Sequence, residues 1–140
     1  MAPDLPAALA DDLGFLLARA SGVAVRAAND ALLDQGLRVR HLSLMQLIAD
    51  QPMTQREVSA GLGLDPSNVV ALVDDLERLE LVQRLASPRD RRTRLVELTP
   101  RGRNRLGAAR TAADDALAGA LSGLTAKQRD QLAGLLRAVR

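Results

Sequence analysis

Apolar residues recur every three or four positions along most of the chain, which places them on one face of an α-helix. Residues 7–35 follow this spacing at Leu9, Leu13, Leu16, Leu17, Ala20 and Val23. Gly36 comes directly afterwards, and glycine is the residue that most easily closes a helix in a left-handed conformation. We therefore predict one long helix over residues 7–35.

Two shorter helices are predicted next. Residues 41–51 read as a helix that stops near Pro52, because proline cannot continue the hydrogen-bond ladder. Residues 54–62 begin with Thr54 and Glu57, the spacing of a capping box in which each side chain binds the other's backbone N–H. Gly61 and Gly63 are expected to break this helix.

The stretch from Asp65 to Glu80 predicts a helix with one buried and one open face. Asp65 is the expected N-cap, and Pro66 fits the first helical position. The buried stripe is formed by Val69, Leu72, Val73, Leu76 and Leu79. The opposite face carries Ser67, Asn68, Val70, Ala71, Asp74, Asp75 and Arg78.

Strand-like runs then flank an arginine-rich loop. Residues 81–86 and 93–98 are predicted to pair as a hairpin, followed by helices over residues 100–121 and 125–139. Two helices joined by a glycine-containing turn, with a hairpin after them, predict a winged helix-turn-helix. The fold class is therefore mainly α with a small β-hairpin wing, in one domain over residues 1–140. Residues 36–99 form the winged helix, and the helices of residues 7–35 and 100–139 lie outside it.

The residue composition excludes several kinds of site and of protein. The chain has 140 residues, no cysteine, one histidine and one aromatic residue, Phe15. The absence of cysteine excludes disulfides, a thiolate zinc site and thiol-based redox sensing. The N-terminal segment lacks the basic residues of a signal peptide, and no apolar run reaches the roughly 18 residues of a membrane span. We expect a cytoplasmic protein that needs no cofactor or metal and does not bind membranes.

Positive charge is concentrated in one part of the chain. Residues 1–83 carry six arginines against twelve acidic residues, whereas residues 84–110 carry nine arginines against two. The segment SPRDRRTR, residues 87–94, contains Arg89, Arg91, Arg92 and Arg94, which we call the wing arginines. A local basic cluster is the electrostatic footprint expected for a polyanion-binding surface. The alternative is an ordinary solvated face of arginines.

Residues 53–103 closely resemble the core of the MarR family of bacterial transcription regulators. The resemblance rests on MTQREVSAGLGLDPS, then LVDDLERLELVQR, and then DRRTRLVELTPRG. It implies a homodimer in which each subunit supplies one winged helix to double-stranded DNA and the terminal helices intertwine. The helices of residues 100–121 and 125–139 agree with this, because they have apolar faces that a winged helix leaves uncovered. Packing of these helices within the monomer is the alternative.

The resemblance assigns roles in DNA binding to particular residues. Ser67, Asn68, Val70 and Ala71 would meet major-groove edges, with Asn68 suited to adenine and Val70 to a thymine methyl. Ser67 would equally serve as a helix cap. In the wing, Asp90 would brace an arginine, Arg91 or Arg92 would enter the minor groove, and Arg89 and Arg94 would contact phosphates. Further phosphate contacts are expected from Thr54, Gln55 and Arg56.

Two features modify this picture. At Ala71 and Asp75 the family often carries arginine or polar residues, so we expect weaker direct base readout here. The family often binds small aromatic or phenolic anions in a cleft between the dimerisation helices and the winged helix. Arg26, His41 and Met45 fall near that cleft and are the candidate ligand residues. The alternative for His41 is a helix cap or a surface position.

Two other functions compete with DNA-dependent regulation. An enzyme is disfavoured, because adjacent pairs such as Asp74 and Asp75 point in different directions on a helix, and no phosphate-binding glycine motif is present. A winged helix that binds protein partners, with weak and sequence-indifferent DNA association, is the second alternative. Our prediction is a repressor that binds a pseudo-palindromic operator and is released by an aromatic ligand.

Overall fold

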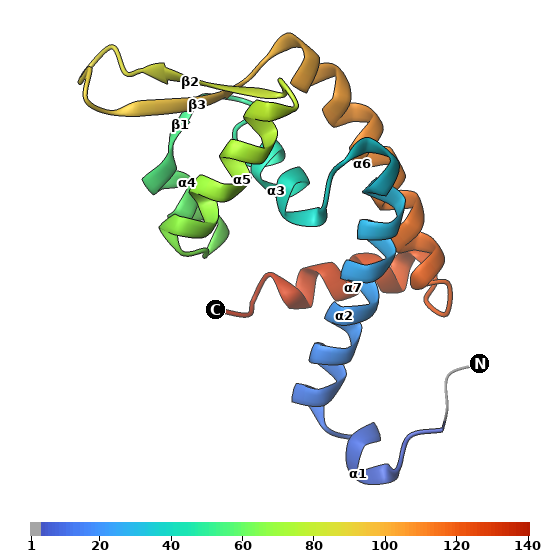
Figure 1. Cartoon of the computed structure of the whole chain (residues 1–140). Helices are drawn as coiled ribbons and strands as arrows, with labels where there is room; N and C mark the ends of the chain where they lie inside the picture. Colours follow the sequence, from blue (N-terminus) through green and yellow to red (C-terminus); the bar gives the residue numbers. More distant parts are fainter. Residues whose placement is uncertain (1–3) are drawn as a thin grey trace.

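The computed structural model describes residues 4–140 and has a winged helix at one end (Figure 1). The elements are α1 (Ala7–Ala10), α2 (Leu13–Leu32), the 3-10 helix η1 (Leu33–Gln35), α3 (Val39–Leu47), β1 (Met53–Thr54), α4 (Gln55–Leu62), α5 (Pro66–Arg78), β2 (Val82–Ala86), β3 (Arg94–Leu98), α6 (Pro100–Ala120) and α7 (Ala126–Leu136). The predicted fold class, mainly helical with a hairpin wing, is confirmed.

The predicted single helix over residues 7–35 is wrong in its continuity. The helix is interrupted at residues 11–12, because Asp12 becomes the N-cap of α2 and its Oδ1 accepts a hydrogen bond from the Phe15 N–H at 2.9 Å. At the other end, the last turn tightens into η1. Gly36 then ends the element with φ of 69°, as predicted.

Capping residues define the starts of α3, α4 and α5. The helix α3 begins at Val39, two residues before the predicted start, because the Arg38 N–H donates to Nδ1 of His41 at 2.9 Å. The predicted capping box of Thr54 and Glu57 is confirmed at the start of α4. Gly63, with φ of 64°, ends α4, whereas Gly61 lies inside it. Asp65 occupies the N-cap position of α5.

The sheet has three antiparallel strands in the order β1-β3-β2. The predicted hairpin is β2 and β3, in which Val82 faces Leu98. The strand β1 is not predicted by the sequence pattern. It pairs Met53 with Val96 and joins the helix-turn-helix to the wing. A two-residue strand is too short to show an alternating pattern, which is why the sequence does not reveal it.

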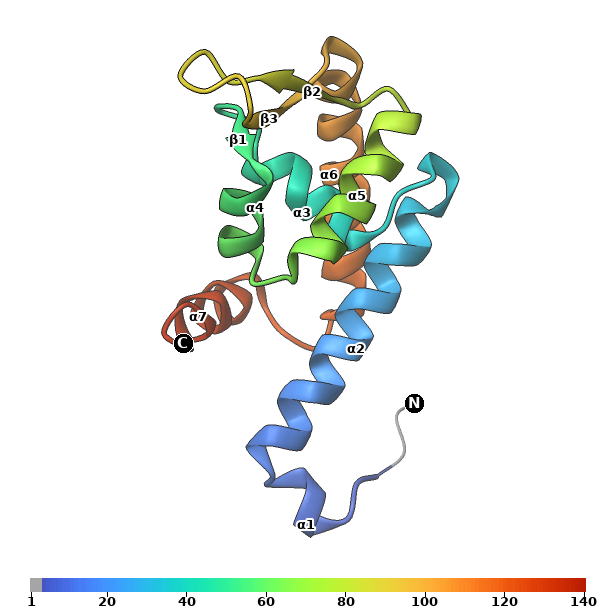
Figure 2. The same cartoon turned by 60° about the vertical axis from the view of Figure 1, so that its left-hand side comes forward.

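The core lies where the helices of the winged helix meet the sheet, and α6 extends away from it beside α2 (Figure 2). Val69, Val73 and Leu76 of the predicted stripe on α5 are buried, and the other two members are half-buried. Between α2 and α6, the small side chains of Ala28, Ala109 and Ala113 are buried. Part of the alanine pattern of α6 therefore serves packing within the chain.

The start of α6 is fastened to the turn before β2. Glu80 has φ of 60°, and its carbonyl oxygen accepts from the Thr99 hydroxyl at 2.7 Å. The Thr99 N–H donates to the Leu81 carbonyl at 3.0 Å, and the Thr99 hydroxyl also caps Gly102. A Cβ atom on Gly102 would lie 2.0 Å from the Leu81 carbonyl oxygen. Only glycine therefore permits this approach of α6 to the wing.

The terminal helices contribute little to the core. Neither α1 nor α7 contains a buried residue, and α7 ends at Leu136, short of the predicted Val139. Exposed apolar side chains occur on these helices, on the first half of α2 and after α7, at Leu9, Leu13, Leu16, Leu17, Leu135, Leu136 and Val139. Between residues 4 and 140, no helix has the length and apolar character needed to cross a membrane.

Gly102→Ala is expected to lower the free energy of unfolding by about 1–3 kcal/mol or more, because the methyl group meets backbone that cannot move aside. Gly107→Ala is the matched control on the same helix, since a Cβ there has no neighbour within 4 Å. The control should raise stability by up to about 1 kcal/mol through helix propensity. Urea unfolding measures both, and equal stability of the two variants would contradict the close approach.

Candidate nucleic-acid interface

The first part of the candidate interface is the exposed face of α5. Ser67, Asn68, Val70 and Ala71 are all exposed, as expected for a recognition helix whose opposite face is in the core. Asp65 occupies the N-cap position but makes no side-chain cap, and Ser67 lies inside the helix. Pro66 has no N–H, and the Asn68 N–H donates to the Asp65 carbonyl at 3.0 Å, so among the described residues the Ser67 N–H is the first-turn donor of α5 that stays open to an anion.

Arg84 of β2 binds the acidic side chains that follow on α5. Its side chain is 22% exposed, and its NH2 group lies 2.7 Å from Oδ1 of Asp74. NH1 lies 3.3 Å from Oε1 of Glu77, and Nε donates to Oε1 of Gln55 at 3.0 Å. One guanidinium thus ties the wing to both helices of the helix-turn-helix and neutralises charge on α5.

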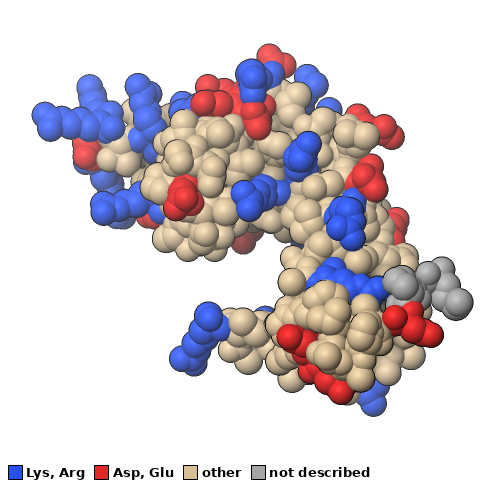
Figure 3. Space-filling model, turned by 60° about the horizontal axis from the view of Figure 1, so that its bottom comes forward, with Lys and Arg blue, Asp and Glu red and all other residues tan. Residues whose placement is uncertain are grey.

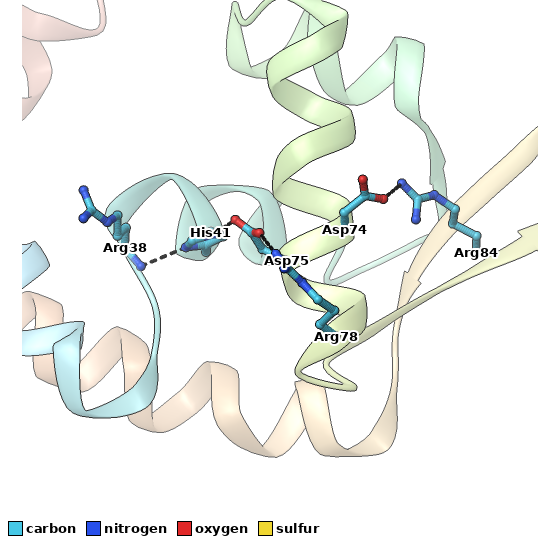
Figure 4. Close-up of polar contacts among 6 residues, drawn as sticks. All are labelled: Arg38, His41, Asp74, Asp75, Arg78 and Arg84. Atoms are coloured by element: carbon cyan, nitrogen blue, oxygen red, sulfur yellow. Dashed lines mark hydrogen bonds and ion pairs between the residues drawn. The ribbon is translucent and has the colours of Figure 1, made fainter.

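Asp75 points the other way, toward α3 (Figure 4). Its Oδ2 lies 3.0 Å from Nε2 of His41, and its Oδ1 pairs with Arg78. Because Nδ1 of His41 accepts the Arg38 N–H, the ring proton is on Nε2 and is donated to Asp75. This hydrogen bond holds the pKa of the Asp75 carboxyl below its usual range, with the charge of Arg78 adding to the effect and burial opposing it.

The wing arginines lie at the tip of the hairpin. Asp90 does not brace an arginine side chain. Its Oδ1 accepts the backbone N–H of Arg92 at 3.0 Å and its Oδ2 accepts the Thr93 hydroxyl at 3.3 Å, which shapes the turn. None of the wing arginines is ion-paired with a described carboxylate. Figure 3 shows basic side chains gathered at the end of the molecule that carries the wing.

The other predicted phosphate contacts lie at the start of α4. Arg56 is exposed, whereas Thr54 and Gln55 are half-buried. The Thr54 hydroxyl accepts the Glu57 N–H in the capping box, and the Gln55 carbonyl is bound to Arg84. Both side chains keep donors that could reach a phosphate.

The structure brings two of the three candidate ligand residues together. Arg26 and His41 line one cavity of about 400 Å³, with Asn29 and Arg38 beside them. Met45 is fully buried in the core and does not line this cavity. His41 is 7% exposed and caps α3, so the helix-cap interpretation holds and the surface position does not.

Sequence reasoning missed Arg84 and Arg38. Arg84 stands in the resemblance motif, two residues after the apolar pair Leu81 and Val82, but nothing in its spacing reveals three partners on two helices. Arg38 precedes the predicted start of α3, so the helical pattern gives it no role. No group of three metal-ligating side chains occurs in the part of the chain that the structure describes.

Arg84→Ala is expected to lower the free energy of unfolding by about 1–3 kcal/mol, because partly buried charge-assisted hydrogen bonds are lost and two carboxylates are left without a cation. Arg91→Ala is the control, since Arg91 is exposed and pairs with no described carboxylate, and it should change stability by less than about 0.5 kcal/mol. Urea unfolding compares the variants. A silent Arg84→Ala would show that this side chain does not hold the wing to α5.

Comparison with known proteins assigns the chain. The MarR family model matches residues 35–93. A protein of Thauera aromatica, named as a putative transcriptional regulatory protein for the hcr operon, is 32% identical over 96 residues, which is 67% of this chain and 58% of that protein. The chain thus spans little more than half the length of this curated relative.

Solved structures match over nearly the whole chain. A MarR-family transcriptional regulator from Rhodococcus sp. RHA1 is 39% identical with a TM-score of 0.87, over 95% of both chains. CouR from Rhodococcus jostii RHA1, bound to p-coumaroyl-CoA, is 40% identical with a TM-score of 0.83, over 95% of this chain and 94% of its own. A CouR repressor bound to a 23-mer DNA duplex is 29% identical with a TM-score of 0.86, over 96% and 97%.

The motifs of residues 53–103, the three-stranded winged helix and these whole-chain identities agree with one another. The chain belongs to the MarR family of transcriptional regulators.

Proposed function

We propose that this protein is a homodimeric repressor that binds a pseudo-palindromic operator in double-stranded DNA in the cytoplasm. The observation that carries the proposal is the set of wing arginines, which are exposed, free of described carboxylate partners and joined through the sheet to a recognition helix with an exposed face. Unpaired guanidinium groups suit the negative potential of a minor groove. A structural neighbour, CouR, is a repressor bound to a DNA duplex, which supports the same partner here.

Base recognition would come from the start of α5. Asn68 would pair with adenine and Val70 would contact a thymine methyl, while Ser67 would hold a phosphate through its hydroxyl and its backbone N–H. Ala71 leaves room rather than adding a contact. Thr54, Gln55 and Arg56 at the start of α4 would position the protein on the backbone without reading sequence.

The dimer would be built from the terminal helices. The exposed apolar side chains of α1, the first half of α2 and α7 form the kind of surface that rarely stays in water. The alternative of packing within the monomer holds for α6, whose Ala109 and Ala113 are buried, but not for α7, which contains no buried residue. Two copies would present two recognition helices to successive major grooves. Sedimentation that returned only monomer would overturn this part of the proposal.

The ligand would be an aromatic anion bound near Arg26, Arg38 and His41. Their cavity offers positive charge beside apolar residues such as Leu33 and Leu37. CouR was solved with p-coumaroyl-CoA, an anionic thioester of an aromatic acid, and this supports the ligand class. Aromatic stacking would contribute little, because the chain has no Trp or Tyr. If aromatic acids and their coenzyme A thioesters neither bind nor release DNA, the sensor role is lost.

The partner-binding alternative rests on the acidic recognition helix. Asp74 and Asp75 have cations of the protein's own, so their charge does not argue against a DNA contact at the start of α5. The test of function also separates these two alternatives.

Fluorescence anisotropy of the protein on its own upstream intergenic DNA and on a scrambled duplex, across a salt series, tests the function. A dimer with about 6–10 phosphate contacts should lose on the order of a thousandfold in affinity between about 50 and 200 mM salt, and the two duplexes should stay separated. Sequence-indifferent binding with a steep salt slope would instead favour the partner-binding module.

Arg91→Ala and Arg92→Ala should each weaken binding to all duplexes alike and reduce the salt slope by about one. Asn68→Ala is the matched comparison, because it should cost about 1–3 kcal/mol on the operator and little on scrambled DNA. Wild-type affinity in both arginine variants would exclude the wing from the interface.

A further inference from the structure

We propose that Asp75 couples anion binding negatively to DNA binding, because its carboxylate and a bound anion compete for the same donor, Nε2–H of His41. This inference rests on the proposed function and adds the coupling between its two sites. Asp75 acts here as a positioning residue for the recognition helix. His41 is the junction, because it lines three neighbouring cavities between the C-terminal end of α2, α3 and α5.

The cavity beside this junction has the chemistry of an anion site. Its volume is about 450 Å³, and Arg38, Arg40, His41 and Asp75 line it together with the apolar residue Leu72. The adjoining cavity adds Arg26 on one side and the opposing carboxylate of Asp30 on the other. None of the arginines Arg26, Arg38 and Arg40 is ion-paired with a described carboxylate, so their charge is available to an incoming anion.

His41 has a single ring N–H to donate. His41 is almost fully buried, and its Nδ1 is occupied by the Arg38 N–H, which leaves Nε2–H as the only ring donor. A ligand carboxylate or phosphate that reached this donor from the cavity would stand next to the carboxylate of Asp75. Two like charges on one donor repel each other, so either the anion is expelled or Asp75 moves away.

Movement of Asp75 would be transmitted to the base-reading residues. Asp75 lies one helical turn beyond Ala71 on α5, and the interior side of that helix is packed through Val69 and Val73. A packed helix shifts as a unit instead of bending at one side chain. Because coupling is reciprocal, an anion that displaces Asp75 lowers DNA affinity to the same degree that bound DNA lowers anion affinity.

Asp75→Asn tests the repulsion while leaving an acceptor for Nε2–H. Asp74→Asn is the matched control: it removes the same charge from the neighbouring position of α5, but Asp74 faces Arg84 and not His41 (Figure 4). Anisotropy on the operator, with and without saturating p-coumaroyl-CoA, gives the coupling factor. Calorimetry on the DNA-free protein gives the affinity for the same probe, and thermal melts confirm that both variants are folded.

In the wild type and Asp74→Asn, the probe should weaken operator binding by about 5- to 150-fold, the usual range of allosteric coupling. In Asp75→Asn the factor should fall, because the amide still accepts from Nε2–H but no longer repels the anion, and the probe should bind the free protein more tightly, on the order of tenfold. Equal coupling in Asp75→Asn and the wild type would overturn the inference.

Two other outcomes separate this inference from the proposed function. Specific operator binding that p-coumaroyl-CoA does not weaken would leave the DNA-binding regulator standing and overturn the competition at His41. Failure of the wild type to distinguish operator from scrambled DNA would overturn the proposed function itself.

Discussion

The recognition helix depends on cations that the protein supplies from elsewhere in its own chain. Three acidic residues in its later turns, Asp74, Asp75 and Glu77, would repel a polyanion if they were left unmatched. Arg84 matches two of them from the wing and Arg78 matches the third, to which His41 also donates a hydrogen bond. These contacts also fix where α5 lies relative to β2 and α3, so charge balance and helix position come from the same bonds.

The two sides of α5 that face Arg84 and His41 differ in their surroundings. Asp74 and Asp75 are neighbours in sequence but point in different directions from α5, one toward the wing and one toward the cavity beside α3. On the Arg84 side, one guanidinium binds three partners and joins β2 to α4 and α5. The His41 side borders a cavity lined by Arg38 and Arg40, so it is the side on which we propose that an anion acts.

Local signals predict much of the fold, and long-range contacts account for what they miss. The capping box at Thr54, Gly36 and Gly63, and the stripe on α5 act through neighbouring residues, so the sequence reveals them. The strand β1 exists only because β3 lies beside it. In the candidate site, the exposed positions of α5 and the wing are predictable from the pattern. The partners of Arg84 are not, because they lie 7 to 29 residues away and follow no periodic rule.

The side-chain bonds that hold α5 in place come from its later turns, while the exposed positions Ser67, Asn68, Val70 and Ala71 come from its beginning. Different residues of one short helix therefore hold it in place and face the proposed DNA. Descendants of a common ancestor could exchange the early side chains, and so acquire new target sites, without rebuilding the frame. The acidic residues Asp74, Asp75 and Glu77 would then be retained in such descendants, because they hold the recognition helix in place and do not contact bases.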